Sequence, residues 1–318
     1  MKNDSFENAM PMTSHRHTAW PGWLAALVVA AGLCLSLSVR AADNAQALRD
    51  KYQTVAPQLA DNVFHRPLVL ESTEAPERLK SDIYSVLDYP FATVKSALGD
   101  PEHGASNWCD VLILHLNIKY CHATQGTDGS VLNVNLGRKV EDSLSSSYRL
   151  EFGYHPVASS ADYFRVELSA ASGPLSTRDY HIMLEAIPAP GAGNHTFLHL
   201  TYAYGYGTAG RLAMRTYLAT VGSGKVGFTK TADASSGGEP EYVGGVRGLL
   251  ERNTMRYYLA IDAYLKSLSA PPDKRLQQRL NAWFTATEQY PRQLHEVERQ
   301  DYLQMKHHEV ERQQQAAQ

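Results

Sequence analysis

The sequence predicts an α+β fold in which an antiparallel sheet packs on one long helix near the C-terminus. Four segments between residues 148 and 204 alternate apolar and polar side chains, and the connections between them are rich in Pro, Gly, Ser and Asn. Residues 242–268 then repeat apolar side chains at a spacing of three to four, which indicates an amphipathic helix. Because a one-sided sheet must bury its apolar face, we expect this helix to cover it.

The N-terminus, residues 1–41, is typical of a secretory signal peptide. An uncharged apolar run from Trp23 to Val39 precedes "VRAAD", which places Val39 and Ala41 three residues and one residue before a cleavage site. We therefore expect cleavage near Ala41, a periplasmic location and no permanent membrane span. A single membrane anchor is the alternative, although the run is slightly shorter than the roughly 20 residues of a span. A lipid anchor on Cys34 is disfavoured because Leu33 precedes it.

The charge balance argues against nucleic acid as a partner. The chain has 30 Lys and Arg against 33 Asp and Glu, a formal net charge of −3. Binding to a phosphate backbone requires an excess of basic side chains, which this sequence lacks.

Residues 42–79 are expected to form an N-terminal lead-in that begins with a helical segment, "AQALRDKYQTVAPQLADNVF". The folded domain is expected over residues 80–270. Its first strand is predicted in "SDIYSVLDYPF". A short helix follows in "PFATVKSAL", where Val94 and Leu98 are four positions apart and Gly99 ends the pattern.

The next segment, "SNWCDVLILHLNIKYCH" at residues 106–122, contains two cysteines. Asn107 and Asp110 have the spacing of a capping box, so we expect a second short helix there, followed by a strand, "NIKYCHAT". A continuous strand over residues 112–120 is the alternative, because apolar side chains also alternate in it.

Cys109 and Cys121 are expected to form a disulfide, because exported proteins fold in an oxidising compartment. Their Cα atoms must then approach within about 7 Å, which a helix followed by a strand allows. Zinc binding with His115 and His122 is disfavoured, since structural zinc ligands usually occur in tight pairs such as C-x2-C. No metal is therefore expected, and two unpaired thiols remain the alternative to the disulfide.

The strands after this segment are expected to form a meander. "TDG" at Thr127–Gly129 is a hairpin signal between the first two. The four later strands have an apolar, tyrosine-rich face that we expect to point inward. The opposite face carries charged residues and is expected to face solvent, together with His181 and His199.

The helix predicted over residues 242–268 carries one polar residue, Asn253, on its apolar stripe. A polar side chain in that place costs stability unless it binds a backbone carbonyl, a ligand or a cavity water. Glu251, Arg252 and Arg256 lie off the stripe and are expected to pair within the helix or at the surface.

Two segments lie outside this simple plan. Residues 205–241 form a Gly-rich insert, for which a lid is one interpretation. Residues 271–318 carry spaced apolar positions among charged ones and predict an amphipathic helical extension bent at Pro291, with a protein partner as one use of it.

Nucleotide-binding motifs are incomplete in this chain. "GYGTAG" at residues 205–210 follows a strand, but the meander supplies no parallel strand–helix–strand unit and no acid follows at the required distance. "GSGK" at residues 222–225 lacks the other residues of a phosphate loop. No cofactor is expected.

The order of a strand, two short helices, a meander and a long C-terminal helix resembles the helix-grip (SRPBCC) superfamily over residues 80–268. This superfamily includes START lipid-transfer domains, pollen-allergen-like proteins and polyketide cyclases. The resemblance implies a curved sheet wrapped around the helix, with a cavity between them for a lipid, sterol or aromatic molecule. The inner-face and helix residues expected to bind it are Phe152, Tyr154, Val166, Tyr180, Ile182, Leu200, Tyr202, Tyr204, Leu250, Asn253 and Tyr257.

These expectations point to a periplasmic carrier of a hydrophobic small molecule or lipid. A cyclase- or hydratase-like enzyme of the same fold is the first alternative, and it would need an acid–base pair in the cavity. No catalytic residue is assigned, because the inner-face positions are nearly all apolar or tyrosine. The second alternative is an interaction protein with a filled core that acts through its C-terminal helix.

Overall fold

The computed structural model describes residues 22–191, 193–220, 224–231 and 241–316. Met1–Arg40 and Ala41–Gln318 are two compact units, and the sheet belongs to the second. Residues 1–21 of the predicted signal peptide lie outside the described residues, and residues 22–40 begin helix α1 (Gly22–Ala60). Cleavage near Ala41 and export stay predictions. Within the described ranges, no helix has both the length and the apolar character to cross a membrane.

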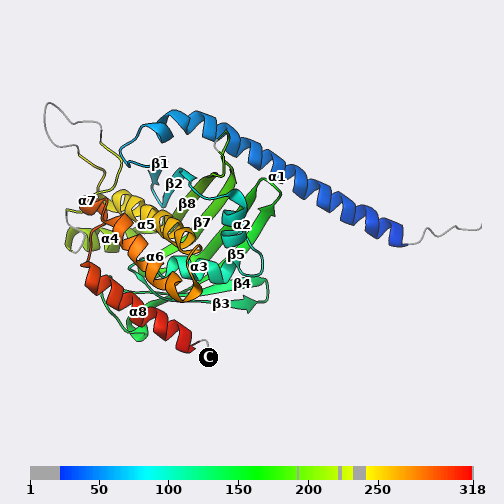
Figure 1. Ribbon diagram of the computed structural model, residues 1–318. Helices are drawn as coiled ribbons and strands as arrows, with labels where there is room; N and C mark the ends of the chain where they lie inside the picture. Colours follow the sequence, from blue (N-terminus) through cyan, green and yellow to red (C-terminus); the bar gives the residue numbers. More distant parts are fainter. Residues whose placement is uncertain (1–21, 192, 221–223, 232–240, 317–318) are drawn as a thin grey trace, which may run out of the picture. The chain divides into compact units, whose positions relative to one another are not determined.

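The sheet is open, curved and antiparallel throughout (Figure 1). Its eight strands lie in the order β1-β2-β8-β7-β6-β5-β4-β3. The N-terminal hairpin β1–β2 therefore extends the meander β3–β8 by pairing with its last strand, β8. The strands are β1 (Leu68–Ala75), β2 (Arg78–Leu87), β3 (Ile118–Gly126), β4 (Gly129–Leu136), β5 (Tyr148–Ser159), β6 (Phe164–Ser172), β7 (Thr177–Pro188) and β8 (Thr196–Tyr206). The predicted meander is confirmed.

Strand β1 was not predicted, because its residues fall within the expected lead-in. It is an edge strand that pairs only with β2. Only Leu68 and Val69 are buried in it, so it lacks the alternation that identifies the central strands. The sheet therefore starts before residue 80, and the lead-in shares one compact unit with the rest of the fold.

Two short helices connect β2 to β3, as predicted: α2 (Phe91–Leu98) and α3 (Gly104–Leu112). The predicted capping box is wrong, because Asn107 lies inside α3 and donates to Ala97 O at 2.8 Å. Asp100 instead accepts hydrogen bonds from two free backbone N–H groups before the helix, those of Glu102 and His103. Chain reversal after α3 brings Cys109 and Cys121 into the predicted disulfide, with a Cα–Cα distance of 5.1 Å. The disulfide leaves neither sulfur available as a zinc ligand.

Helix α5 (Gly245–Ser267) lies across the inner face of the sheet, with α6 (Pro272–Thr287) beside it (Figure 1). The extension after α5 is not one bent helix. Pro291 starts a separate short helix, α7 (Pro291–Leu294), and α8 (Arg299–Ala316) follows it. Helices α6 and α8 contact each other, and α8 also packs on β3.

Three charged residues of α5 that were expected to pair within the helix or at the surface lie in the interior instead. Glu251, Arg252 and Arg256 are all fully buried. Glu251 accepts hydrogen bonds from the backbone N–H groups of Phe228 and Thr229, and Arg256 binds Glu296. Pairing within the helix, the other part of the prediction, does occur for Glu251, with Arg247 at 3.8 Å. The surface location was wrong because residues 224–231 and the C-terminal extension cover the outer side of α5, which a simple helix-grip plan leaves in solvent.

The outer face of the sheet is also covered. Residues of α1 from Ala41 to Leu59 pack on β2, β7 and β8 in a second apolar cluster. His199, expected in solvent, is therefore only 8% exposed and lies between Asp82 and Glu185. His181, on β7 like Glu185, is partly buried and pairs with Glu167.

Candidate ligand-binding cavity

A cavity of about 850 Å³ lies between α5 and the inner face of the sheet. Strands β4, β5, β7 and β8 form its floor, and α5 forms one wall. The position agrees with the sequence prediction. The residues from these elements that line it are Val134, Leu136, Phe152, Thr177, Tyr180, Ile182, Tyr202, Tyr204, Leu249, Asn253 and Tyr257.

Most of the predicted ligand-binding residues line this cavity: Phe152, Tyr180, Ile182, Tyr202, Tyr204, Asn253 and Tyr257. Four of the predicted residues do not. The Tyr154 hydroxyl donates to Leu98 O and Asp100 O, and so holds the turn between α2 and α3. Val166, Leu200 and Leu250 are buried in the packed core instead. They have the expected orientation, but helices and neighbouring side chains fill the space above them.

Four tyrosines give the cavity an aromatic wall. Tyr180 stacks on Tyr204 with ring centroids 5.3 Å apart, and Tyr257 meets Tyr202 edge-on at 5.3 Å. The Tyr180 hydroxyl is paired with Thr177 at 2.7 Å. The hydroxyls of Tyr202, Tyr204 and Tyr257 make no hydrogen bond with the part of the protein that the structure describes. Burial raises the pKa of all three, so they stay neutral donors.

His115 follows α3 and brings a polar group to the cavity. Its Nδ1 accepts a hydrogen bond from the Asn117 backbone N–H at 3.2 Å, so the ring proton belongs on Nε2. The Nε2 atom is buried and has no hydrogen-bond partner among the described residues. The ring stacks on Tyr257, with centroids 4.9 Å apart.

His115 is neutral. Burial lowers its pKa well below the usual value, and the positive charges of Arg256, Lys306 and Lys139 lower it further. Asn253 lies beside the ring, outside normal hydrogen-bond geometry, and offsets part of this effect. The cavity therefore contains a neutral imidazole N–H donor.

An ion pair lies at the same end. Lys139 binds Glu296 at 2.6 Å, and Arg256 binds the same carboxylate at 2.8 Å. Burial and the charge of Arg256 lower the pKa of Lys139 to about 8. Burial raises the pKa of Glu296, but the charges of Arg256 and Lys139 outweigh it, and the net shift is downward. We call His115, Lys139, Asn253 and Glu296 the polar end of the cavity.

Sequence reasoning identified only Asn253 of the polar end. His115 lies in a turn, Lys139 in the β4–β5 connection and Glu296 between α7 and α8. Loop residues have no periodicity, so only the fold brings them together. The one available signal was His115 as a polar residue on the apolar face of its predicted helix.

The insert at residues 205–241, interpreted above as a lid, is described only in part. Helix α4 (Thr208–Thr220) occupies the start of the insert, and its Met214 lines the cavity. It contacts the segment Pro174–Ser176, whose Leu175 also lines the cavity and is 55% exposed. Residues 221–223 and 232–240 of the insert lie outside the described residues.

No protein-family model matches the sequence, and no curated protein is similar to it. Solved structures with some similarity were found. Norcoclaurine synthase from Thalictrum flavum, in complex with dopamine and hydroxybenzaldehyde, is 10% identical, with 49% of this chain and 82% of that chain covered and a TM-score of 0.31. Human STARD10 is 9% identical (54% and 75% covered, TM-score 0.27). CalU16 from Micromonospora echinospora is 11% identical (69% and 96% covered, TM-score 0.24).

These TM-scores are too low to support an argument, so the fold is assigned from the topology of this chain. An open antiparallel sheet in the order given above faces one long C-terminal helix, two short helices follow β2, and a cavity separates sheet and helix. The chain has the helix-grip fold predicted from its sequence, enlarged by the covering segments at both ends.

Proposed function

We propose that this chain is an exported, periplasmic binding or carrier protein for a hydrophobic small molecule. The observation that carries the proposal is the cavity of about 850 Å³, with its aromatic wall and three phenol groups that have no hydrogen-bond partner in the described part of the chain. This volume lies in the range of about 300–1,000 Å³ that is typical of small-molecule sites. A protein that acts only through its surface has no need of such a space, which argues against the interaction-protein alternative.

The lining defines the kind of molecule that fits. Binding is driven by the burial of apolar surface, at about 25 cal/mol per Å² before ordering costs. The phenols of Tyr202, Tyr204 and Tyr257 then orient the ligand, because each is a neutral donor that a bound acceptor satisfies. A lipid, sterol or aromatic molecule with few polar groups meets both conditions.

Two features support export. The apolar run before Ala41 has the pattern of a signal peptide. The Cys109–Cys121 disulfide suits an oxidising compartment such as the periplasm.

Binding of Nile red, a neutral hydrophobic dye, tests the proposed function. Filling the cavity from the floor by Ile182→Trp, or from α5 by Leu249→Trp, is expected to weaken dye binding at least tenfold, about 1.4 kcal/mol. Val63→Trp is the matched control, because Val63 is 51% exposed and does not line the cavity. Equal dye affinity in all four proteins, with circular dichroism spectra unchanged, would place the dye outside the cavity and contradict the proposal.

An enzyme of the cyclase or hydratase type is a second candidate, favoured by one observation. His115 and Glu296 both line the cavity, so it contains two ionisable side chains in addition to the apolar and tyrosine residues of the sheet. Acid–base catalysis needs two such groups. A bound molecule recovered chemically unchanged after prolonged incubation supports the carrier. A molecule recovered as a new product, and not so with His115→Phe, supports the enzyme.

A further inference from the structure

The polar end of the cavity has a feature that binding of a purely apolar molecule does not use. A neutral N–H donor, His115 Nε2, is buried and has no hydrogen-bond partner among the described residues, although an unpaired buried donor pays its full desolvation penalty. His115 lines the cavity, so two acceptors are available to this N–H group: an atom of a bound ligand and the amide oxygen of Asn253, which lies beside the ring.

The charges around this donor are predominantly positive. Glu296 is the carboxylate partner of both Lys139 and Arg256, so one negative side chain faces two cations. The charges of Lys139 and Arg256 also reach His115, where both disfavour a protonated ring. An extra negative charge placed here is therefore stabilised, whereas an extra positive charge is repelled.

The other end of the cavity is of a different character. Phe152, Tyr180, Ile182 and Tyr204 lie on the sheet side, and the charged groups of the polar end come from connections and from the C-terminal extension. The cavity thus has an apolar, aromatic part and a positively charged part.

We propose that the ligand is an amphipathic carboxylic acid, with its carboxylate at Lys139 and His115 and its apolar body along the tyrosine wall. The inference rests on the proposed function and specifies the ligand class. A carboxylate has two acceptor oxygens, which match one ammonium and one imidazole N–H donor. Asn253, on α5, adds an amide group to the cavity lining.

Three probes with the same alkyl chain and different heads test this proposal: dodecanoic acid, dodecanol and dodecylamine, each measured by displacement of Nile red at pH 7. We expect the acid to bind about tenfold more tightly than the alcohol, since a charge-assisted hydrogen bond is roughly twice as strong as a neutral one. The amine is expected to bind least tightly, because Lys139 and Arg256 repel it.

The variant Lys139→Met is expected to reduce the affinity for the acid about tenfold, to about that for the alcohol. His115→Phe keeps the ring that stacks on Tyr257 and removes the donor, so it should weaken acid binding severalfold. Lys274→Met is the matched control, because Lys274 is exposed and outside the cavity lining, and it should change neither affinity.

The outcomes separate the two proposals. Equal affinity for acid and alcohol, or an acid preference that survives Lys139→Met, overturns the carboxylate inference while the hydrophobic-carrier function stands. A preference for the amine also overturns the carboxylate inference and leaves the carrier function standing, because it would mean that the negative charge of Glu296 dominates at the polar end. Failure of all three probes and of Nile red to bind overturns the proposed function, and the inference with it.

Discussion

His199 lies on the outer face of the sheet, yet it is buried between two carboxylates because α1 covers this part of that face. Its two ring nitrogens lie 2.8 Å from a Glu185 oxygen and 2.9 Å from an Asp82 oxygen. Two carboxylate partners require two donors, so the ring is an imidazolium. Burial lowers the pKa of His199, but the hydrogen bonds to Asp82 and Glu185 outweigh it and raise the pKa above its ordinary value.

This cluster predicts a pH-dependent stability. A group whose pKa is raised by folding contributes stability that is complete below its unfolded value, about 6.5, and is lost as the pH rises through its folded value. His199→Phe is expected to lower the free energy of unfolding by about 3 kcal/mol at pH 6, since it leaves two carboxylates without their cation. The deficit relative to the unmodified protein should shrink steadily above pH 7 in urea denaturation.

His181→Phe provides the comparison, because its pairing with Glu167 is only partly buried. It should cost less than about 1 kcal/mol. A deficit for His199→Phe that is constant from pH 6 to 9 would mean that the ring is neutral in the folded protein.

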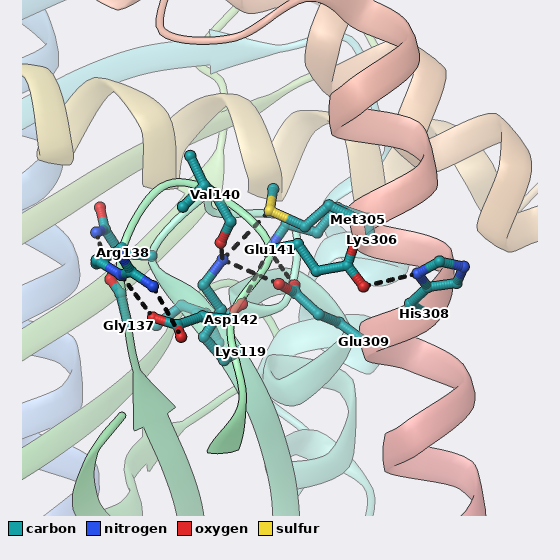
Figure 2. A network of polar contacts seen from close by, with 12 residues as sticks. Lys119, Gly137, Arg138, Val140, Glu141, Asp142, Met305, Lys306, His308 and Glu309 are labelled. Atoms are coloured by element: carbon teal, nitrogen blue, oxygen red, sulfur yellow. Dashed lines mark hydrogen bonds and ion pairs between the residues drawn. The ribbon is translucent and has the colours of Figure 1, made fainter. Parts of the chain in front are cut away.

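At the scale of elements, helix α8 is anchored to β3 by three fully buried charges (Figure 2). Lys119 on β3 and Lys306 on α8 both donate to Glu309, at 2.9 and 2.7 Å. The ammonium groups also donate to backbone carbonyls, Lys119 to Val140 and Lys306 to Ile118. Because Val140 adjoins Lys139 and lines the cavity, the extension supports the polar end.

Removing the shared carboxylate should release this anchor. Glu309→Gln leaves two buried ammonium groups without a counter-charge and is expected to cost about 3–5 kcal/mol of stability. Glu311→Gln, on an exposed face of the same helix, should stay within about 0.5 kcal/mol of the unmodified protein. Similar denaturation midpoints for the two variants would refute a structural role for the buried charges.

The elements differ in how well their sequences reveal them. Strands β5–β8 and helix α5 were predicted because their apolar side chains repeat at the spacing of a strand or of a helix. The edge strand β1 and the break at Pro291 were not, since little of β1 is buried and a proline is compatible with either a bend or a new helix start. The disulfide could be predicted because an exported chain cleaved near Ala41 keeps two cysteines, and a helix followed by a strand, or an equal reversal of the chain, brings Cys109 and Cys121 close.

At the scale of the whole molecule, the limit of sequence reasoning is long-range coverage. Alternation placed Tyr180 and Tyr202 on the inner face, which is where the cavity lies. It placed Leu200 there as well, although α5 and the neighbouring core close that part of the face. Glu251 was expected to pair within the helix or at the surface, and its burial was missed because nothing local in the sequence shows that residues 224–231 return to cover α5.

The cavity is likewise a property of the assembled chain. Its floor and helix wall come from the helix-grip core, while Met214, Lys139 and Glu296 come from the insert, a loop and the extension. The added segments therefore complete the cavity rather than form separate functional modules. The central claim is that this cavity holds a hydrophobic ligand.

Native mass spectrometry of the protein isolated from the cells that produce it tests this claim most directly. We predict a mass excess corresponding to one small molecule per chain, which organic solvent extracts and which is missing from the cavity-filling variant Ile182→Trp but present in Val63→Trp. Bare chain mass in all three proteins, or a mass excess that Ile182→Trp retains in full, would contradict the claim.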